Sequence, residues 1–208
     1  MIKIREYDLP DAELLNDNYA GPGVLVWVPD FFCIVLGQSN DPVASIVIDG
    51  VKKDNIPVYK RPSGGETVVL SANTLVISLV KKNEPLRSPK RYFSYFNGEI
   101  IHALSSLGVQ DLAQRGISDI CLGNKKILGS SIYRNKDTLF YHAVLNISEP
   151  VLNMEKYLKH PSREPGYREK RSHKDFVTSL TSRGYQLKAE DIKRVWERQK
   201  STFLPAFS

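Results

Sequence analysis

Short apolar runs rich in β-branched residues, separated by Pro, Gly and Asp, constrain the fold of this chain more than any other feature. Runs of this length between turn residues are typical of β-strands. The first third of the chain therefore predicts four strands, at Val24–Val28, Cys33–Leu36, Thr67–Leu70 and Leu75–Val80.

One long helix is expected to follow. Ser88 can cap its first amides, Pro89 loses no hydrogen bond at the first helical position, and Gly108 suits a left-handed end. Between them apolar residues recur at helical spacing and predict one buried face: Phe93, Phe96, Ile100, Leu104 and Leu107.

Strands return in the second half of the chain, and the first two of them are expected to form a hairpin through Gly123-Asn124. These strands are Ile117–Leu122, Lys126–Ser131 and Leu139–Leu145. The basic segment Lys156–Arg171, which also contains Pro and Gly, predicts an exposed loop.

Two helical segments are expected near the end. The first starts at a capping box, Ser172 to Asp175, and turns three apolar residues inward: Phe176, Val177 and Leu180. The second, Ala189–Arg198, is amphipathic, with Ile192, Val195 and Trp196 on one side. The order of elements predicts an α+β fold, in one domain over residues 1–208 with a short helical tail from about residue 172.

Composition excludes several classes of protein. With 41% hydrophobic and 25% charged residues, the chain has an ordinary globular composition, unlike disordered or low-complexity sequences. The net charge of +6 suits an acidic partner or an anionic ligand. A nucleic-acid-binding module is disfavoured, because aromatic residues are not interleaved with the basic clusters.

The two cysteines, Cys33 and Cys121, are too few for a disulfide framework or a four-ligand zinc site. This favours a reducing cytoplasm and no dedicated metal site. Met1–Tyr19 is too charged for a secretory leader, and Val24–Val28 is too short for a membrane span. We therefore expect a cytoplasmic protein that does not bind a membrane.

The segment Tyr59–Val68 is the most informative for function. Its adjacent glycines, Gly64 and Gly65, allow the backbone to approach a ligand closely. Arg61 can form paired bonds to a carboxylate or phosphate, and Ser63 adds a hydroxyl. Taken alone, the two glycines favour an ordinary hairpin turn over a ligand-binding loop.

A second candidate site lies at Lys125-Lys126, just after the expected hairpin turn. Neighbouring side chains of a strand point to opposite faces, so one lysine can be solvated while the other faces a cleft. A lysine beside Gly129, Ser130 and Ser131 would stabilise negative charge on an acyl or phosphate oxygen during transfer. The alternative is a solvated lysine pair at a hairpin end.

Taken together, these segments resemble the biotin/lipoate A/B protein ligase family, which includes lipoate–protein ligase A and the lipoyl and octanoyl transferases. The segment Arg61–Val68 is similar to the family's Arg-Arg-x-Ser-Gly-Gly-Gly-x-Val signature. The other blocks follow in the family's order: Leu36–Pro42, Asn73-Thr74, Ser118–Ile120, Lys126–Ser131 and Phe140–Leu145. The ordered set spans roughly residues 12 to 180 and is more specific than any one block.

The resemblance implies a mixed sheet flanked by helices, as in biotin ligases and class II aminoacyl-tRNA synthetases, with an acyl tunnel beside the Gly-Gly loop. It implies that Lys126 is the catalytic lysine. The residues implied to bind the ligand are Arg61, Ser63, Gly64, Gly65, Asp119, Gly129, Ser130, Ser131, His142 and Ala143. Further candidates are Gly37, Asn40, Arg134 and Cys121.

The resemblance also implies cofactors and partners. In the ligases, ATP with Mg²⁺ activates lipoate as lipoyl-AMP, which a lysine of an acceptor domain of the E2 or glycine-cleavage H type attacks. Three interpretations stay open. The first and preferred one is a lipoate–protein ligase, which could work with a separate accessory subunit. The others are an octanoyl or lipoyl transferase without ATP and a non-catalytic lipoate-binding relative.

Three departures from the family pattern bear on nucleotide use. Glu66 stands where a third glycine is usual, Leu70-Ser71 replaces His-Asp, and Lys60 replaces an arginine. We also expect no separate accessory domain after Leu180.

Two further features have alternative interpretations. Cys121 is either an acyl-carrying nucleophile activated by Lys126 or a buried structural cysteine, and its place after Ser118-Asp119 favours the buried role. The basic segment Pro165–His173 either meets the acidic surface of an acceptor domain or is a solvated loop.

Overall fold

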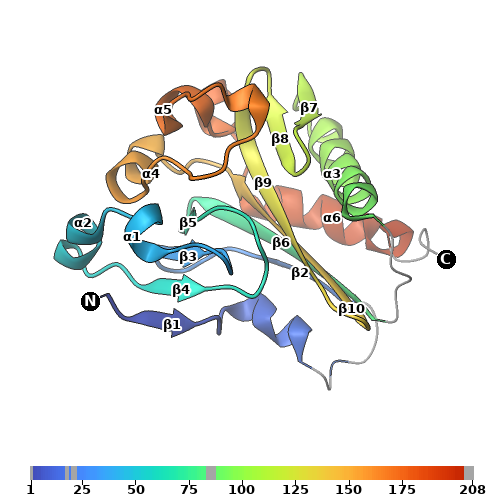
Figure 1. Ribbon diagram of the computed structural model, residues 1–208. Helices are drawn as coiled ribbons and strands as arrows, with labels where there is room; N and C mark the ends of the chain where they lie inside the picture. Colours follow the sequence, from blue (N-terminus) through green and yellow to red (C-terminus); the bar gives the residue numbers. More distant parts are fainter. Residues whose placement is uncertain (1, 17–18, 20–22, 83–87, 204–208) are drawn as a thin grey trace.

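The computed structural model describes residues 2–16, 19, 23–82 and 88–203 and has the expected α+β architecture (Figure 1). A four-stranded sheet has the strand order β1-β4-β3-β5, and a six-stranded antiparallel sheet has the order β2-β6-β10-β9-β8-β7. The strands of the four-stranded sheet are β1 (Ile4–Glu6), β3 (Cys33–Leu36), β4 (Val58–Lys60) and β5 (Val68–Leu70). Those of the six-stranded sheet are β2 (Gly23–Trp27), β6 (Thr74–Lys82), β7 (Leu112–Arg115), β8 (Asp119–Leu122), β9 (Lys125–Arg134) and β10 (Thr138–Asn146).

Helices flank both sheets. The α-helices are α1 (Pro42–Ser45), α2 (Ile48–Lys53), α3 (Pro89–Ser106), α4 (Val151–Tyr157), α5 (His173–Phe176) and α6 (Ala189–Phe203). The 3-10 helices are η1 (Pro10–Leu15), η2 (Gly166–Arg168) and η3 (Thr181–Arg183). None of the helices in the described part of the chain is long and apolar enough to cross a membrane.

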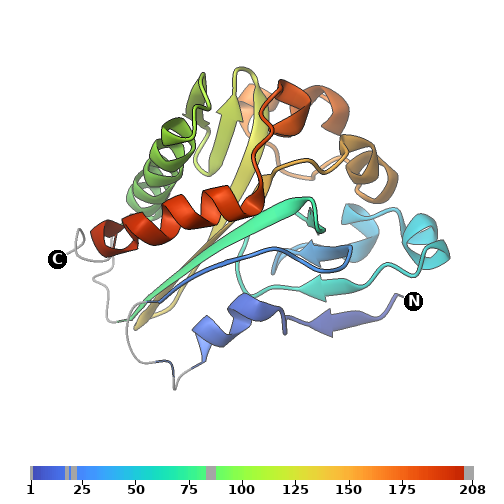
Figure 2. The same cartoon turned by 180° about the vertical axis from the view of Figure 1, so that it is seen from behind.

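The layers follow from strands whose two faces are both apolar. Leu75 and Ile77 of β6 pack with α3 and α6, whereas Val76, between them, packs against β3 and β4. Successive side chains of a strand point to opposite faces, so β6 holds a helical layer on one side and the four-stranded sheet on the other. Figure 2 shows α6 crossing the back of the six-stranded sheet.

The four-stranded sheet has the same two-sided pattern. Val35 of β3 faces the six-stranded sheet, while Ile34 and Leu36 pack with residues from α2 and α4 and with Ile46, which directly follows α1. The resulting order of layers is α3 and α6, the six-stranded sheet, the four-stranded sheet, and then α1, α2 and α4. Polar side chains that lie between the two sheets are therefore enclosed from both sides.

The long helix and the hairpin agree with the sequence-based expectation. Helix α3 covers Pro89–Ser106, and Gly108 has the left-handed φ of +88° predicted for its end. Strands β8 and β9 form the hairpin around Gly123, with Cys121 opposite Lys126. Ser88 differs from the prediction, because its side chain makes no capping hydrogen bond.

The prediction of an exposed loop over Lys156–Arg171 was wrong in part. Helix α4 runs into this segment, and Arg168 is only 5% exposed. The helix expected after Ser172 is a single turn, although Ser172 caps it by accepting from the Asp175 amide at 3.2 Å. Val177 then forms a bridge to Lys126, so pairing with β9 outweighs local helix propensity.

Six short elements that the sequence did not predict lie at a sheet edge (β1 and β7), inside the four-stranded sheet (β4) or beside that sheet (α1, α2 and α4). Their stability comes from tertiary contacts, which leave little periodic signal in three to seven residues.

The C-terminal helix should be part of the core. Trp196 is 1% exposed and packs with Ile192 in the cluster beneath α3. We expect Trp196→Ala to lower the free energy of unfolding by about 3–5 kcal/mol, because a large cavity replaces the indole. The exposed neighbour offers a control, since Glu197→Ala should change it by less than about 0.5 kcal/mol. Urea denaturation of both variants measures this, and equal midpoints for Trp196→Ala and the wild type would contradict the packing of α6.

Candidate functional site

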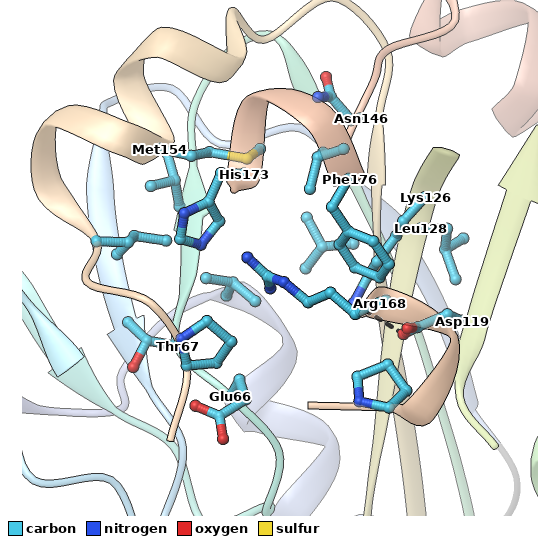
Figure 3. A pocket seen from close by; sticks show the side chains of 18 of the residues that line it. Glu66, Thr67, Asp119, Lys126, Leu128, Asn146, Met154, Arg168, His173 and Phe176 are labelled. Atoms are coloured by element: carbon cyan, nitrogen blue, oxygen red, sulfur yellow. Dashed lines mark ion pairs between the residues drawn. The ribbon is translucent and has the colours of Figure 1, made fainter. Parts of the chain in front are cut away.

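Two adjoining cavities lie between the sheets and the segment from residue 158 to residue 177. The large cavity has a volume of about 660 Å³, and the small cavity, drawn in Figure 3, has a volume of about 140 Å³. They share a boundary formed by Glu66, Thr67, Val68, Asp119, Lys126, Gly129, Val144, Arg163 and Pro165. Lys126 is therefore accessible from both cavities.

An ion pair orients the Lys126 side chain at this boundary. Its Nζ lies 2.8 Å from Oδ1 of Asp119, and Tyr167 donates a hydrogen bond of 2.7 Å to Oδ2 of the same carboxylate. An ammonium has three N–H donors, so two remain for a ligand. Lys125 points away and donates to the carbonyl of Lys174 at 2.9 Å.

A β-bulge brings Lys126 over Gly129. The two residues are three apart, and regular pleating would place them on opposite faces of the strand. Cys121 pairs with Lys126 while Ile120 pairs with Leu128, so Ile127 is one extra residue in β9. A Cβ atom at Gly129 would lie 2.7 Å from Nζ of Lys126, which explains why glycine suits this position.

The guanidinium of Arg61 donates hydrogen bonds to groups of the Gly-Gly loop itself. The side chain is 4% exposed, and its Nη2 donates to the carbonyls of Gly64 at 2.7 Å and Glu66 at 2.9 Å. Nε donates to Ser63 at 3.0 Å, and Nη1 donates to the carbonyl of Val35 at 3.2 Å. Burial lowers the pKa of Arg61 to about 10, so the group stays charged at neutral pH. The sequence suggested paired contacts to a ligand; the structure instead gives these donors to the loop backbone.

Two further groups of residues brace the same loop. Ser131 donates to the carbonyl of Gly64 at 2.7 Å. A Cβ at Gly37 would meet the carbonyl oxygen of Gly65 at 2.0 Å, so only glycine allows this approach. Asn40 accepts from the Gly37 amide at 2.8 Å and thereby fixes the turn that carries it.

The structure separates the sequence-predicted residues into three groups. Those that line the large cavity are Arg61, Gly65, Asp119, Lys126, Gly129, Ser130, Ser131, His142 and Asn40. Those behind the cavity wall are Ser63, Gly64 and Gly37. Those outside both cavities are Ala143, Arg134 and Cys121.

Each residue outside the cavities has another environment. Ala143 is 1% exposed and packs in the core below α3, and Arg134 lies at the exposed end of β9. Cys121 is fully buried and donates to the hydroxyl of Tyr167 at 3.5 Å. Burial raises the pKa of the Cys121 thiol, so the structural role is favoured over the nucleophile.

Sequence reasoning missed Arg168, which the small cavity encloses. Its guanidinium stacks on Phe176 at 4.7 Å, and Nε donates to the carbonyl of Arg171 at 3.0 Å. Nη2 is buried and has no hydrogen-bond partner among the described residues. Figure 3 shows the group reaching into the cavity from the side of Phe176. An orphaned cationic donor in a cavity suits an anionic, oxygen-rich ligand. The basic segment gave no signal that this arginine, and not its neighbours, points inward.

The neighbouring His173 adds no charge. Burial, together with the positive charge of Arg168, lowers the pKa of His173 to about 4, so the imidazole is neutral at pH 7. Among the described residues, no group of three or more His, Cys, Asp or Glu side chains is placed to hold a metal ion.

Two lipoate–protein ligases from bacteria are similar in sequence to this chain. Lipoate-protein ligase A of Psychrobacter cryohalolentis is 27% identical over 129 residues, which are 62% of this chain and 36% of that protein. Lipoate–protein ligase 1 of Staphylococcus aureus is 27% identical over 126 residues, which are 61% of this chain and 38% of that protein. The matches thus span little more than a third of the length of these curated relatives.

Solved structures share the fold. A bipartite lipoate protein ligase of Thermoplasma acidophilum, studied with its E2 lipoyl domain, has a TM-score of 0.78 at 20% identity, covering 92% of this chain and 76% of that one. A lipoate-protein ligase A bound with ATP has a TM-score of 0.73 at 20% identity, with coverages of 88% and 72%. A Thermoplasma acidophilum protein with bound lipoic acid has a TM-score of 0.75 at 18% identity, with coverages of 92% and 77%.

The family itself is shown by the sequence. The model of the lipoyl protein ligase A/B catalytic domain matches residues 11–200, which is most of the chain. This protein therefore belongs to the lipoyl protein ligase A/B catalytic domain family.

Proposed function

We propose that this chain carries out the chemistry of a lipoate–protein ligase, joining lipoate to a lysine of a lipoyl-acceptor domain through a lipoyl-adenylate. The observation that carries the proposal is the position of the Lys126 ammonium at the boundary of two cavities. An acyl carboxylate reaching this point from one cavity meets a phosphate reaching it from the other, beside a fixed positive charge.

The large cavity suits the acyl group. Val35, Leu70, Val76 and Val144 supply apolar wall, and the polar residues gather toward Lys126. Leu70 stands where the family usually has histidine, so this departure enlarges the apolar wall. Ser71, beside it, donates to the buried carboxylate of Glu149 and faces away from the acyl site.

Lys126 would stabilise the developing charge. Asp119 uses one N–H and holds the ammonium in place, which leaves two N–H groups for the acyl and phosphate oxygens. A charged donor that is already oriented needs little reorganisation in the transition state, which is where it must act.

The residues of the small cavity fit a nucleotide. ATP, with Mg²⁺, supplies the activation of the carboxylate when it is bound. Arg168 would donate its unpaired N–H groups to phosphate oxygens, and Val69, Leu128 and Phe176 offer apolar surface for a base. The solved lipoate-protein ligase A bound with ATP supports this use.

The acceptor would approach where Arg163 and Lys170 are exposed beside the cavities. Positive charge there favours an acidic acceptor domain of the E2 or glycine-cleavage H type. The Thermoplasma acidophilum ligase studied with its E2 lipoyl domain supports such a partner. A separate accessory subunit and a cytoplasmic location are parts of the same proposal.

A transferase is the second candidate, because Leu70-Ser71 lacks the His-Asp pair and because acyl groups that arrive activated need no nucleotide. The assay below separates the two. The purified chain is incubated with lipoate, ATP-Mg²⁺ and an acceptor domain, with and without a candidate accessory subunit, and the acceptor is weighed by mass spectrometry.

We expect Lys126→Ala to lower the rate of acceptor lipoylation about 10²–10³-fold, because the oriented ammonium is lost. Lys125→Ala is the matched control and should keep the wild-type rate, since its side chain points away from both cavities. Acylation from octanoyl carrier protein without ATP would instead support the transferase. Thermal stabilisation by lipoate without any transfer would support a binding protein.

Gly129→Ala should weaken the same activity without unfolding the protein. The new methyl group would lie 2.7 Å from Nζ and 2.9 Å from Cε of Lys126, so the flexible side chain must leave Asp119. We expect a loss of about 10–100-fold in kcat/KM with an unchanged melting temperature. Gly98→Ala is the control, because its methyl group meets nothing within 4 Å. Full activity of Gly129→Ala would show that the ammonium position does not matter.

Arg168→Met should separate nucleotide binding from stability. Calorimetry should show ATP binding weakened about tenfold or more, because a charged hydrogen bond to phosphate is lost. Urea denaturation should show the free energy of unfolding lowered by no more than about 1–2 kcal/mol, because methionine keeps apolar contact with Phe176 while the ion pair with Glu164, at 3.6 Å, and the bond to the Arg171 carbonyl are lost. The exposed Arg183→Met should alter neither quantity. Unchanged ATP affinity in Arg168→Met would argue against a nucleotide in the small cavity.

A further inference from the structure

A fully buried carboxylate of η1 lies against the six-stranded sheet, outside the chemistry proposed above. Asp11 of η1 is 0% exposed and accepts from the hydroxyls of Tyr7 at 2.8 Å and Ser78 at 2.6 Å. Its Oδ2 also lies 3.5 Å from Nδ1 of His142. A buried charge with three partners on different elements is costly unless its partners are held in place.

The line of contacts continues from His142 to the Gly-Gly loop. Nε2 of His142 is 2.6 Å from Oγ of Ser63, and Ser63 accepts from Nε of Arg61 at 3.0 Å. Arg61 in turn donates to the carbonyls of Gly64 and Glu66, on either side of Gly65, and Gly65 and Glu66 line the large cavity.

The direction of each hydrogen bond is determined by the groups at the two ends. A carboxylate can only accept, so a neutral His142 ring carries its proton on Nδ1, which faces Asp11. Nε2 then accepts the hydroxyl proton of Ser63 in a hydrogen bond, while the Ser63 oxygen accepts from Arg61. We call the hydrogen bonds that run from Asp11 through His142 and Ser63 to Arg61 the relay. In this direction the relay requires a neutral His142 in the Nδ1–H tautomer.

We propose that Asp11, His142 and Ser63 are positioning residues, whose directed relay fixes the Arg61 guanidinium and thereby the Gly65–Glu66 wall of the large cavity. The relay and its effect on the loop do not depend on the ligand. The consequence for lipoate binding rests on the proposed function.

The Ser–His–Asp order matches that of nucleophilic triads, but the surroundings differ. Ser63 is 0% exposed, and it is Arg61, not Ser63, that lines the cavity. A nucleophile must reach the acyl carbon, so the enclosed hydroxyl of Ser63 suits a structural bond and not acyl transfer.

Acid should break the relay. The charged and titratable groups that face His142 are Asp11 from η1, Tyr7 from the preceding segment and Arg61 from the loop. Burial is the main cause that lowers the pKa of His142 below 6.5, and Asp11 opposes this effect. The neutral ring thus prevails at pH 7. As the pH falls through the lowered pKa, a second N–H would point at Ser63 and the Ser63 proton would lose its acceptor.

Amide hydrogen exchange measures the loop directly. In Asp11→Asn and Ser63→Ala, the peptide covering residues 61–68 should exchange about tenfold faster than in the wild type, because the loop opens more often. The controls are the same two substitutions, Asp to Asn and Ser to Ala, made at residues outside the cavities. Asp54→Asn alters a carboxylate that also accepts from a tyrosine, at 2.8 Å from Tyr157, and Ser179→Ala removes another buried serine hydroxyl. Both controls should leave the exchange of this peptide unchanged.

Nitrogen-15 NMR of the His142 ring tests the direction of the relay without any substitution. Near neutral pH we expect a protonated Nδ1 and an unprotonated Nε2, with loop exchange rising as the ring titrates in acid. In Asp11→Asn the ring should titrate at a lower pH, because the carboxylate that favours the imidazolium is gone. Two results would overturn the relay: an Nε2–H tautomer of His142 in the wild type, or an exchange rate of the 61–68 peptide that does not change with pH as the ring titrates.

Lipoate binding then shows whether the relay serves the proposed function. Ser63→Ala should weaken lipoate binding about tenfold and raise KM while kcat is retained, because a less ordered wall binds less well and the Lys126 site is untouched. Labelling of Ser63 by an acyl or fluorophosphonate reagent would instead make it a nucleophile and refute the positioning role. If the exchange and NMR results hold but the wild type does not bind lipoate, the relay stands and the proposed function fails.

Discussion

The two-sided burial of β6 and β10 is the constraint on which the rest of the structure depends. Every residue of β6 from Thr74 to Val80 is buried. Leu75, Ile77 and Leu79 pack against the helical layer, and Val76 packs against the four-stranded sheet. A shift of one residue would exchange these faces, so the register of β6 and β10 is strongly determined. It also places Ser78 and His142 between the sheets, where a polar side chain must find a protein partner.

The candidate site forms where this regular pattern is interrupted. The extra residue in β9 turns Lys126 toward the cavities and over Gly129, while the same strand continues as a regular partner of β10 further along. A bulge is one way in which a sheet can re-aim a side chain without losing its core. The backbone of Lys126 also binds the returning chain, since its carbonyl accepts from the Thr178 amide at 2.9 Å. One residue thus links the sheet to the segment that covers the small cavity.

Much of this could be read from the sequence, and the limits have physical causes. The strands over Cys33–Leu36 and Leu139–Leu145 are apolar runs between turn residues, and helix α3 has a clear helical period. Ordered motifs marked the loop at Gly64 and the lysine at position 126. Arg168 points into the small cavity and Asp11 is buried because of contacts between segments that are distant in the sequence. The local sequence around either residue does not predict such contacts. The bulge at Ile127 has the same cause, because register is decided by the partner strand.

The departures from the family signature become intelligible in the structure. Arg61 donates its hydrogen bonds to loop carbonyls. The positively charged donors that remain available to a ligand are therefore those of Lys126 and Arg168. Glu66, in place of a third glycine, accepts from the Arg163 amide at 3.2 Å and ties the Gly-Gly loop to the segment that carries Arg168. A carboxylate that would repel an anionic ligand is thus partly engaged by a backbone donor. Glu66 therefore joins the wall of the large cavity to the segment that brings Arg168 into the small cavity, so movement of that segment would alter both cavities together.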